Sequence, residues 1–317
     1  MKDGAASSWR GAQELAEDLV NAGGGHVQCV LLYGSHLYGT SPNRYSAIDF
    51  IVLVDDYHGF YTALNKSQRL QRSAALMSAM AYILPPNVIA YSQGAEGGRL
   101  AKCNVVNRNH LEGALGARPR DHYLLGRSVQ ELGFVWSASA DERMWVEGLL
   151  AKARERVLTW MSPYLTEPVN AYGLGRRMLE VCYQGELRPE AADRYRHTFE
   201  AQEDHFIQVL GPVLSEAERC GLMIAEEGKY RLVSPASAGA TLRWKSHFMR
   251  SKLRAAMRAL KNTLTFDDWL SYIVRKAERH SGKTINLTWP ERQLPLVFLW
   301  PRAIIFLLSR PKRDPRQ

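Results

Sequence analysis

Short apolar runs separated by polar turns dominate the first third of the chain. Residues 27–33 and 48–54 are rich in β-branched, leucine and aromatic side chains, and glycine or polar residues bound both runs. Apolar runs of four to eight residues between turn signals are typical of buried strands. Residues 88–91 and 101–106 have the same character around a glycine-rich turn. The pattern therefore predicts four strands in this part of the chain.

Elsewhere the apolar positions recur at intervals of three and four residues, which is the helical period. One helix is expected before the first strand, where a serine can cap it and Gly23 ends it. A second is expected after the second strand, and it must stop before Pro85. From about Asp141 the pattern is mostly helical, with one short strand near 229–233. The helical ranges expected there are 144–164, 174–183 and 191–210.

Strands followed by a long helical region predict an α+β protein. We expect three segments: a domain at 1–137, a mostly helical domain at 138–235, for which a winged-helix-like arrangement is one option, and a basic amphipathic region at 236–317. The first boundary rests only on the change of pattern. The second is marked by a stretch of small residues and proline, Ser-Pro-Ala-Ser-Ala-Gly, and by a sharp change in charge.

The positive charge of the chain is concentrated in its last quarter. Of 317 residues, 46% are hydrophobic and 23% charged, an ordinary globular composition, and the four cysteines are far apart, which excludes a disulfide scaffold or zinc ribbon. The net charge is +9, yet 17 basic and only 5 acidic residues lie from Thr241 to the end. This asymmetry predicts an anionic partner for the C-terminal region, either a nucleic acid or a membrane surface.

Residues 241–264 predict an amphipathic helix of the kind that binds at membrane interfaces. Leucine and methionine recur there at intervals of three, four or seven, and basic residues fill the other positions with no acid among them. The alternative is a helix packed on its own protein. Farther on, the apolar run 294–308 is broken by Pro301 and is too short to span a bilayer, so it would lie in the interface. Nucleic-acid grooves interleave cations with aromatic residues, and such a partner is disfavoured.

The residues with the clearest chemical meaning are Gly34 and Ser35, which end the first predicted strand, and Asp49, which begins the second. A glycine lets backbone approach a phosphate closely, and a carboxylate on the adjacent strand can hold Mg²⁺ against it. Lys102 lies in an otherwise apolar strand, where a charge is costly unless it is used. It is a candidate for neutralising a triphosphate, or an edge-strand lysine that discourages aggregation.

A second metal ligand is expected, but its identity is open. Residue 51, two positions after Asp49, is isoleucine, so the usual pair of alternating carboxylates is missing. Asp55 would share a face with Asp49, although roughly 20 Å along the strand. We take Asp55 as the second metal ligand, Asp56 as the next option and Glu186 as a distant third. The alternative is that Asp55 and Asp56 only cap the following turn.

The sequence resembles the mitochondrial type of phosphatidate cytidylyltransferase, a CDP-diacylglycerol synthase of the nucleotidyltransferase superfamily. The likeness lies in Tyr-Gly-Ser at 33–35, Ile-Asp-Phe-Ile-Val-Leu-Val-Asp-Asp at 48–56, Gly-Arg-Leu-Ala-Lys at 98–102, Tyr-Leu-Leu-Gly-Arg at 123–127 and Tyr-Gln-Gly-Glu-Leu-Arg at 183–188. Each fragment is short, and their shared order over residues 28–260 is the stronger argument. The last 55 or so residues find no counterpart.

This resemblance implies a nucleotidyltransferase-like mixed sheet and a reaction between CTP and phosphatidic acid that gives CDP-diacylglycerol and pyrophosphate. With the resemblance and the residue chemistry together, we expect Asp49 and Lys102 as catalytic residues and Mg²⁺ or Mn²⁺ on Asp49 and Asp55. The basic C-terminal region predicts an anionic membrane surface as a partner. The nucleotide-binding residues would be Tyr33, Gly34, Ser35, Lys102 and Arg127.

Two rival functions stay open at this point. A nucleotidyltransferase acting on tRNA, a protein or a small molecule would use the same Gly34, Ser35 and Asp49 chemistry without lipid. A non-catalytic membrane-binding protein would explain the missing second carboxylate. Because no transit peptide is visible, we expect a peripheral protein on the cytoplasmic face of a membrane, with a bacterial inner membrane favoured.

Overall fold

The computed structural model describes residues 3–38, 47–93, 99–185, 194–265 and 288. The chain divides into two units, residues 1–265 and 266–317, and only residue 288 of the second is described. The apolar run 294–308 therefore lies outside the described residues. Among the helices that are described, none combines the length and hydrophobicity needed to cross a bilayer.

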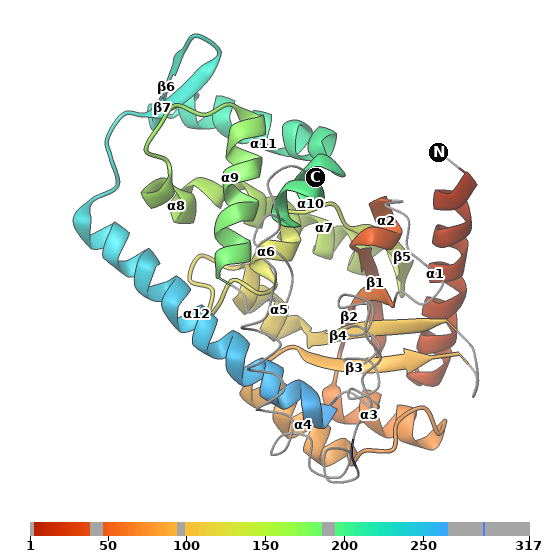
Figure 1. Ribbon diagram of the computed structural model, residues 1–317. Coiled ribbons are helices and arrows are strands. Elements are labelled where there is room, and N and C mark those ends of the chain that lie inside the picture. Colours follow the sequence, from red (N-terminus) through yellow and green to blue (C-terminus); the bar gives the residue numbers. More distant parts are fainter. Residues whose placement is uncertain (1–2, 39–46, 94–98, 186–193, 266–287, 289–317) are drawn as a thin grey trace. The chain divides into compact units, whose positions relative to one another are not determined.

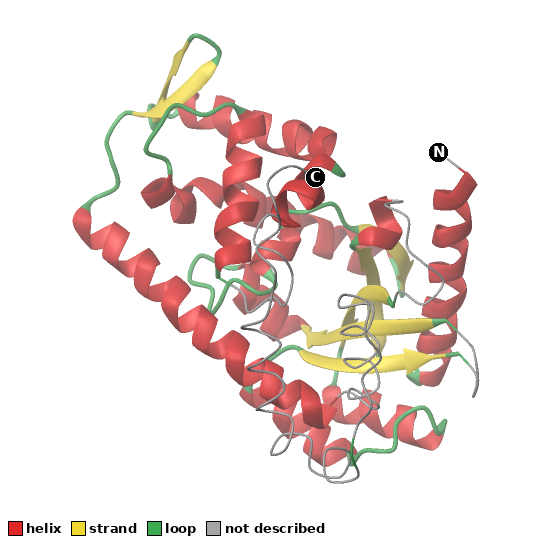
Figure 2. Cartoon of the chain, in the orientation of Figure 1, coloured by secondary structure: helices red, strands yellow, loops and turns green. Residues whose placement is uncertain are grey.

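The described chain is α+β, as the alternation of patterns predicts (Figures 1 and 2). Its strands are β1 (Val27–Tyr33), β2 (Ile48–Val54), β3 (Asn87–Ser92), β4 (Leu100–Asn107), β5 (Gly133–Ser137), β6 (Met223–Glu226) and β7 (Lys229–Leu232). Its helices are α1 (Asp3–Ala22), α2 (Ser35–Tyr38), α3 (Tyr57–Lys66), α4 (Ala74–Ile83), α5 (Arg108–Leu115), α6 (Leu125–Ser128), α7 (Ala140–Glu155), α8 (Val157–Met161), η1 (Ser162–Tyr164), α9 (Ala171–Gln184), α10 (Arg194–Glu200), α11 (Glu203–Arg219) and α12 (Ala238–Thr265).

Five strands form a mixed sheet in the order β3-β4-β2-β1-β5. β1 pairs antiparallel with β2 and β5, β3 pairs antiparallel with β4, and β2 and β4 are parallel. One row across the sheet runs from Tyr33 through Asp49 and Lys102 to Ala90. Laterally paired residues project to the same face of a sheet, so this register brings a carboxylate and an ammonium group together.

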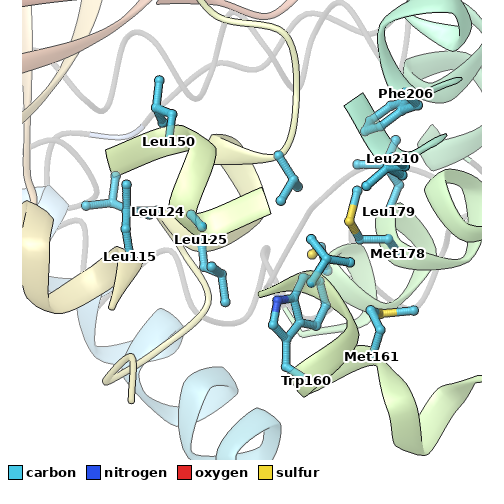
Figure 3. Close-up of a cluster of buried hydrophobic side chains, with 14 of the residues drawn as sticks. Leu115, Leu124, Leu125, Leu150, Trp160, Met161, Met178, Leu179, Phe206 and Leu210 are labelled. Atoms are coloured by element: carbon cyan, nitrogen blue, oxygen red, sulfur yellow. The ribbon is translucent and has the colours of Figure 1, made fainter. Parts of the chain in front are cut away.

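The sheet is buried on both faces by different helices. Val30, Phe50 and Cys103 face one cluster, which α1, α3 and α4 complete. Leu31, Ile51 and Val106 face the other cluster, which α5–α11 and the start of α12 complete; part of it is shown in Figure 3. The second cluster crosses both domain boundaries predicted near 137 and 235, and these boundaries stay predictions.

Several elements differ from the sequence pattern. The strands 27–33 and 48–54 are confirmed residue for residue, but β5 and β6 were not expected. The polar loop expected after β1 begins with the short helix α2. The helix expected at 144–164 is divided into α7, α8 and η1, and the one at 191–210 into α10 and α11. The short helices α2, α8 and α10 lack a long apolar period and depend on tertiary packing.

The helix α12 is confirmed, but its buried face is not the one that its apolar period suggests. Leu242, Met249, Leu253, Met257, Leu260 and Leu264, here called the α12 stripe, are all exposed, from 45% at Leu264 to 71% at Leu242. The buried face carries Trp244, Phe248, Ser251, Arg258, Lys261 and Thr265. Two of the basic residues on this helix, Arg258 and Lys261, are buried and have hydrogen-bond partners in the body of the protein, so the helix is also packed on its own protein.

Candidate functional site

The carboxylate of Asp49 lies against the backbone bend at Gly34. Gly34 follows the last residue of β1 and has φ of +81°, a conformation that favours glycine. A Cβ atom at this position would lie 3.2 Å from Asp49 Oδ2. Tyr33, the residue before the bend, is the register partner of Asp49 on β2. The structure thus brings together Gly34 and Asp49, and Asp49 is half-buried rather than enclosed in the core.

Lys102 extends this arrangement to a third strand. It is the register partner of Asp49 on the parallel strand β4 and is also half-buried. Both residues interrupt otherwise buried strands on the face toward α5–α9. An opposite charge beside a partly buried group offsets the cost of removing it from water. The pair forms a polar patch at one end of an apolar face.

The charged groups of this patch shift the pKa of the Tyr33 hydroxyl. Burial raises its pKa well above the ordinary value, and Asp49 raises it further, whereas Arg127 and Lys102 oppose the shift. Tyr33 therefore stays protonated at physiological pH and can donate a hydrogen bond.

A buried polar network supports Tyr33 from behind. Asn104, fully buried on β4, donates to the Tyr33 hydroxyl at 2.8 Å and to the Phe50 carbonyl at 2.9 Å. Tyr123 donates to Asn104 Oδ1 at 2.6 Å. Sequence reasoning did not select Asn104, although an asparagine inside an apolar strand is the same signal that singled out Lys102.

Arg127 belongs to the same network. It is buried, and its Nη1 donates to the Tyr123 carbonyl at 2.6 Å. Its Cζ lies 3.7 Å from the Tyr123 ring centroid and 5.7 Å from that of Tyr33. The guanidinium group is therefore held over aromatic rings near the patch, where it adds positive charge.

Ser35 is placed next to the bend. It begins α2 and is half-buried, and the Gly34 carbonyl accepts from the Leu37 amide at 2.9 Å. His36 is the next residue of α2 and is half-buried as well.

The structure does not bring Asp55 to Asp49. β2 runs without interruption between them, and six residues of strand span roughly 20 Å. Asp55 instead lies 2.9 Å from His26 Nδ1, and Asp56 caps α3 by accepting from the Gly59 amide at 2.6 Å. The pairing of Asp49 and Asp55 on one metal has no support in this geometry, and the capping alternative describes Asp56.

The described residues contain no group of three or more histidine, cysteine, aspartate or glutamate side chains arranged to hold a metal. Mg²⁺ commonly uses only one or two protein carboxylates, with substrate phosphates and water as the other ligands. Asp49 beside the space left by Gly34 fits such a one-carboxylate site. Glu186 and Arg188 lie outside the described residues.

The fold and site together define an α+β protein with an aspartate–lysine pair beside a glycine bend on a mixed sheet. No family model and no curated protein matches the chain. A matching solved structure is that of a nucleotidyltransferase-like protein from Exiguobacterium sibiricum 255-15, at 10% identity over 93% of this chain and 89% of that chain, with a TM-score of 0.26. A likeness of this extent does not assign the chain to a family.

Proposed function

We propose that the chain is a nucleotidyltransferase that transfers CMP from CTP to phosphatidic acid at a membrane surface, giving CDP-diacylglycerol and pyrophosphate. One observation carries the nucleotidyl-transfer part: the Asp49 carboxylate lies at the Gly34 bend and is in register with Lys102. The choice of CTP and phosphatidic acid comes from the sequence resemblance. The proposed location is the cytoplasmic face of a membrane, with a bacterial inner membrane favoured.

In this proposal Asp49 would hold Mg²⁺ or Mn²⁺, which supplies neutralisation of charge on the triphosphate. The backbone at Gly34 and the Ser35 hydroxyl would contact the phosphates, and Lys102 would neutralise them further. Tyr33 would donate a hydrogen bond, and Arg127 would add positive charge.

The reaction itself needs little proton transfer. A phosphate oxygen of phosphatidic acid, already ionised, attacks the α-phosphorus of CTP. The bond from that phosphorus to the bridging oxygen of the β-phosphate breaks, and pyrophosphate leaves with the electron pair. Catalysis then depends on positioning and charge, which a single carboxylate and a few cations can provide.

The α12 stripe supports the membrane part of the proposal. Six leucine and methionine side chains are exposed on one side of a 28-residue helix, drawn in blue in Figure 1. Arg243, Lys245, Arg250 and Lys252 are exposed around its first half. Apolar side chains flanked by cations are suited to an anionic lipid surface, where each basic residue contributes about 1 kcal/mol.

The test is an assay of the purified chain with labelled CTP, Mg²⁺ and phosphatidic acid in mixed micelles. We expect lipid-linked CMP from the wild type and a loss of roughly a hundredfold or more in Asp49→Asn, which keeps the shape but removes the charge. Asp55→Asn at the other end of β2 is the matched control and should retain activity.

The same assay separates the rival functions. Pyrophosphate release that needs no lipid would indicate a nucleotidyltransferase with a tRNA, protein or small-molecule substrate. Vesicle binding without any metal-dependent turnover would indicate a non-catalytic membrane protein. Either result contradicts the proposed lipid substrate.

A further inference from the structure

A small cavity lies where α5, the Pro85–Pro86 segment and α12 meet. Its volume is about 90 Å³, several times the roughly 10–15 Å³ that one water molecule requires. The polar side chains that line it include His110, Arg120, Asp121 and Arg254. We call it the cationic pocket.

Basic groups outnumber acidic ones around this pocket. Asp121 is its buried carboxylate, and its Oδ2 accepts from Arg254 at 2.9 Å and from Arg258 at 2.7 Å. These two arginines hold the pKa of Asp121 below its ordinary value despite its burial. Asp121 is thus already saturated by two cations, and Arg120 adds another guanidinium group to the lining.

Arg258 and Lys261 place further buried hydrogen-bond donors near the pocket. Arg258 is only 2% exposed, and its Nε has no hydrogen-bond partner among the described residues. Lys261, one helical turn farther along α12, donates to the carbonyl of Pro86 at 2.8 Å and to Asn87 Oδ1 at 2.9 Å. Burial, Arg258 and Arg254 lower the pKa of Lys261 to about 7. Desolvation is the main cause of this shift, and the two neighbouring arginines add to it.

His110 lines the pocket from the α5 side. Its pKa is lowered by burial first and then by Arg120 and Lys261. Its Nδ1 lies 2.9 Å from the Tyr57 hydroxyl, and the ring of Tyr82 packs edge-on against it. Uncompensated cations in a partly buried place are costly, and a bound anion would relieve that cost.

We infer that the cationic pocket is a binding site for a phosphate monoester dianion, with Arg120 and Arg254 as its main ligands and His110 as a further donor. Arginine suits this role because its planar fork binds phosphate oxygens bidentately. The dianion could be inorganic phosphate or the headgroup of phosphatidic acid, which present the same tetrahedral group.

This site is separate from the one at Asp49. Asn87, which follows the Pro85–Pro86 segment, pairs with Val105, three residues along β4 from Lys102 and therefore about 10 Å away. Tyr123 contacts residues of both sites, because Arg258 Cζ lies 4.4 Å and Arg127 Cζ 3.7 Å from its ring centroid. The inference goes beyond the proposed reaction and does not need it.

The experiment follows the His110 resonances by NMR while the full chain is titrated at constant ionic strength. The probes are inorganic phosphate, a short-chain monomeric phosphatidic acid, and acetate. We expect the chemical shifts of His110 to change in a saturable way with at least one of the two phosphate probes. The His110 pKa should rise at the same time, because a nearby dianion favours the protonated ring. Which probe binds identifies the source of the anion, and acetate should bind more weakly than either.

Arg120→Gln is the test variant and Arg118→Gln, an exposed arginine outside the lining, is its matched control. Arg120 is exposed, so the variant should fold. Loss of a charged hydrogen-bond donor should weaken phosphate binding roughly tenfold or more, and the control should bind as the wild type does. Absence of saturable binding, equal binding by Arg120→Gln, or acetate binding as tight as phosphate would each overturn the inference. Because the readout needs no turnover, an inactive chain would not affect it.

Discussion

Gly34 determines how closely the end of β1 and the Asp49 carboxylate can approach. Its φ of +81° is accessible to glycine at little cost, and the space where a Cβ would stand is bounded by Asp49 Oδ2. Behind it, Asn104 fixes the hydroxyls of Tyr33 and Tyr123. The geometry of the candidate site therefore depends on one backbone conformation and one buried amide.

We predict that Gly34→Ala weakens nucleotide binding and destabilises the fold. The left-handed conformation costs a residue with a Cβ about 1–2 kcal/mol, and the methyl group would press on the Asp49 carboxylate. Denaturant unfolding and CTP titration measure the two effects. Gly148→Ala is the control: it lies inside α7 with open space around it, and it should raise stability by about 0.5–1 kcal/mol. Unchanged nucleotide binding in Gly34→Ala would argue against a role for this bend.

A second prediction concerns Tyr123→Phe. It keeps the ring beneath Arg127 and Arg258 but leaves Asn104 Oδ1 buried without its donor, so the free energy of unfolding should fall by about 1–3 kcal/mol. Tyr172→Phe, at a partly exposed position on α9, should change stability by no more than about 0.5 kcal/mol. Equal stability of the two variants would show that the network contributes little.

At the scale of elements, α12 has two apolar faces with different roles. Trp244 and Phe248 join the buried cluster, whereas the α12 stripe faces away from it. The buried face is fixed by partners distant in sequence, such as Asp121 for Arg258. One face of α12 thus packs on the rest of the protein, while the other presents an exposed hydrophobic surface.

Substitutions on the two faces should therefore separate stability from membrane binding. The double variant Met249→Gln with Leu253→Gln should unfold within about 0.5 kcal/mol of the wild type, because both side chains are exposed. It should lose co-sedimentation with vesicles that contain phosphatidic acid. Phe248→Ala should cost about 3–5 kcal/mol, because its ring is buried. Undiminished vesicle binding by the double variant would exclude the α12 stripe as the membrane contact.

At the scale of the whole molecule, two histidines that are largely shielded from solvent link stability to pH. Burial lowers the pKa of His205 on α11 and of His247 on α12, in each case to about 4. Both rings are then neutral in the folded protein at neutral pH, whereas the unfolded chain takes up protons below about 6.5. Because the unfolded state binds more protons in this window, acid favours unfolding.

We predict that stability is full above about pH 6.5 and is lost as the pH falls toward about 4. Each histidine contributes a slope of at most about 1.4 kcal/mol per pH unit, reduced by its partial exposure to solvent. Denaturant midpoints measured across this range test the slope. His205→Gln should flatten it, and His58→Gln, at an exposed position, controls for the loss of a histidine. An unchanged slope in His205→Gln would contradict the assignment.

Much of the sheet could be predicted because strands β1 and β2 are short apolar runs with clear boundaries. β5 could not, since Gly133–Ser137 has no alternating pattern and becomes a strand only by pairing with β1. In the site, the sequence predicts Gly34, Asp49 and Lys102, because a glycine, a carboxylate and an ammonium group at these positions suit phosphate and metal binding. Asn104 carries the same local signal as Lys102, but its hydrogen bonds to Tyr33 and Tyr123 depend on register, which a local pattern does not contain. The distance from Asp49 to Asp55 follows from the strand rise, whereas the contact of Asp55 with His26 depends on tertiary packing.

From the amino-acid order alone follow the α+β class, the edges of β1 and β2, a helix over 241–264 and its stripe of leucine and methionine. These features are local, because side-chain period and backbone preference act over a few residues. Tertiary structure decided which face of α12 is buried, which aspartate meets Gly34 and where cations gather around Asp121. Those outcomes require contacts between segments far apart in the chain, and only packing selects among them.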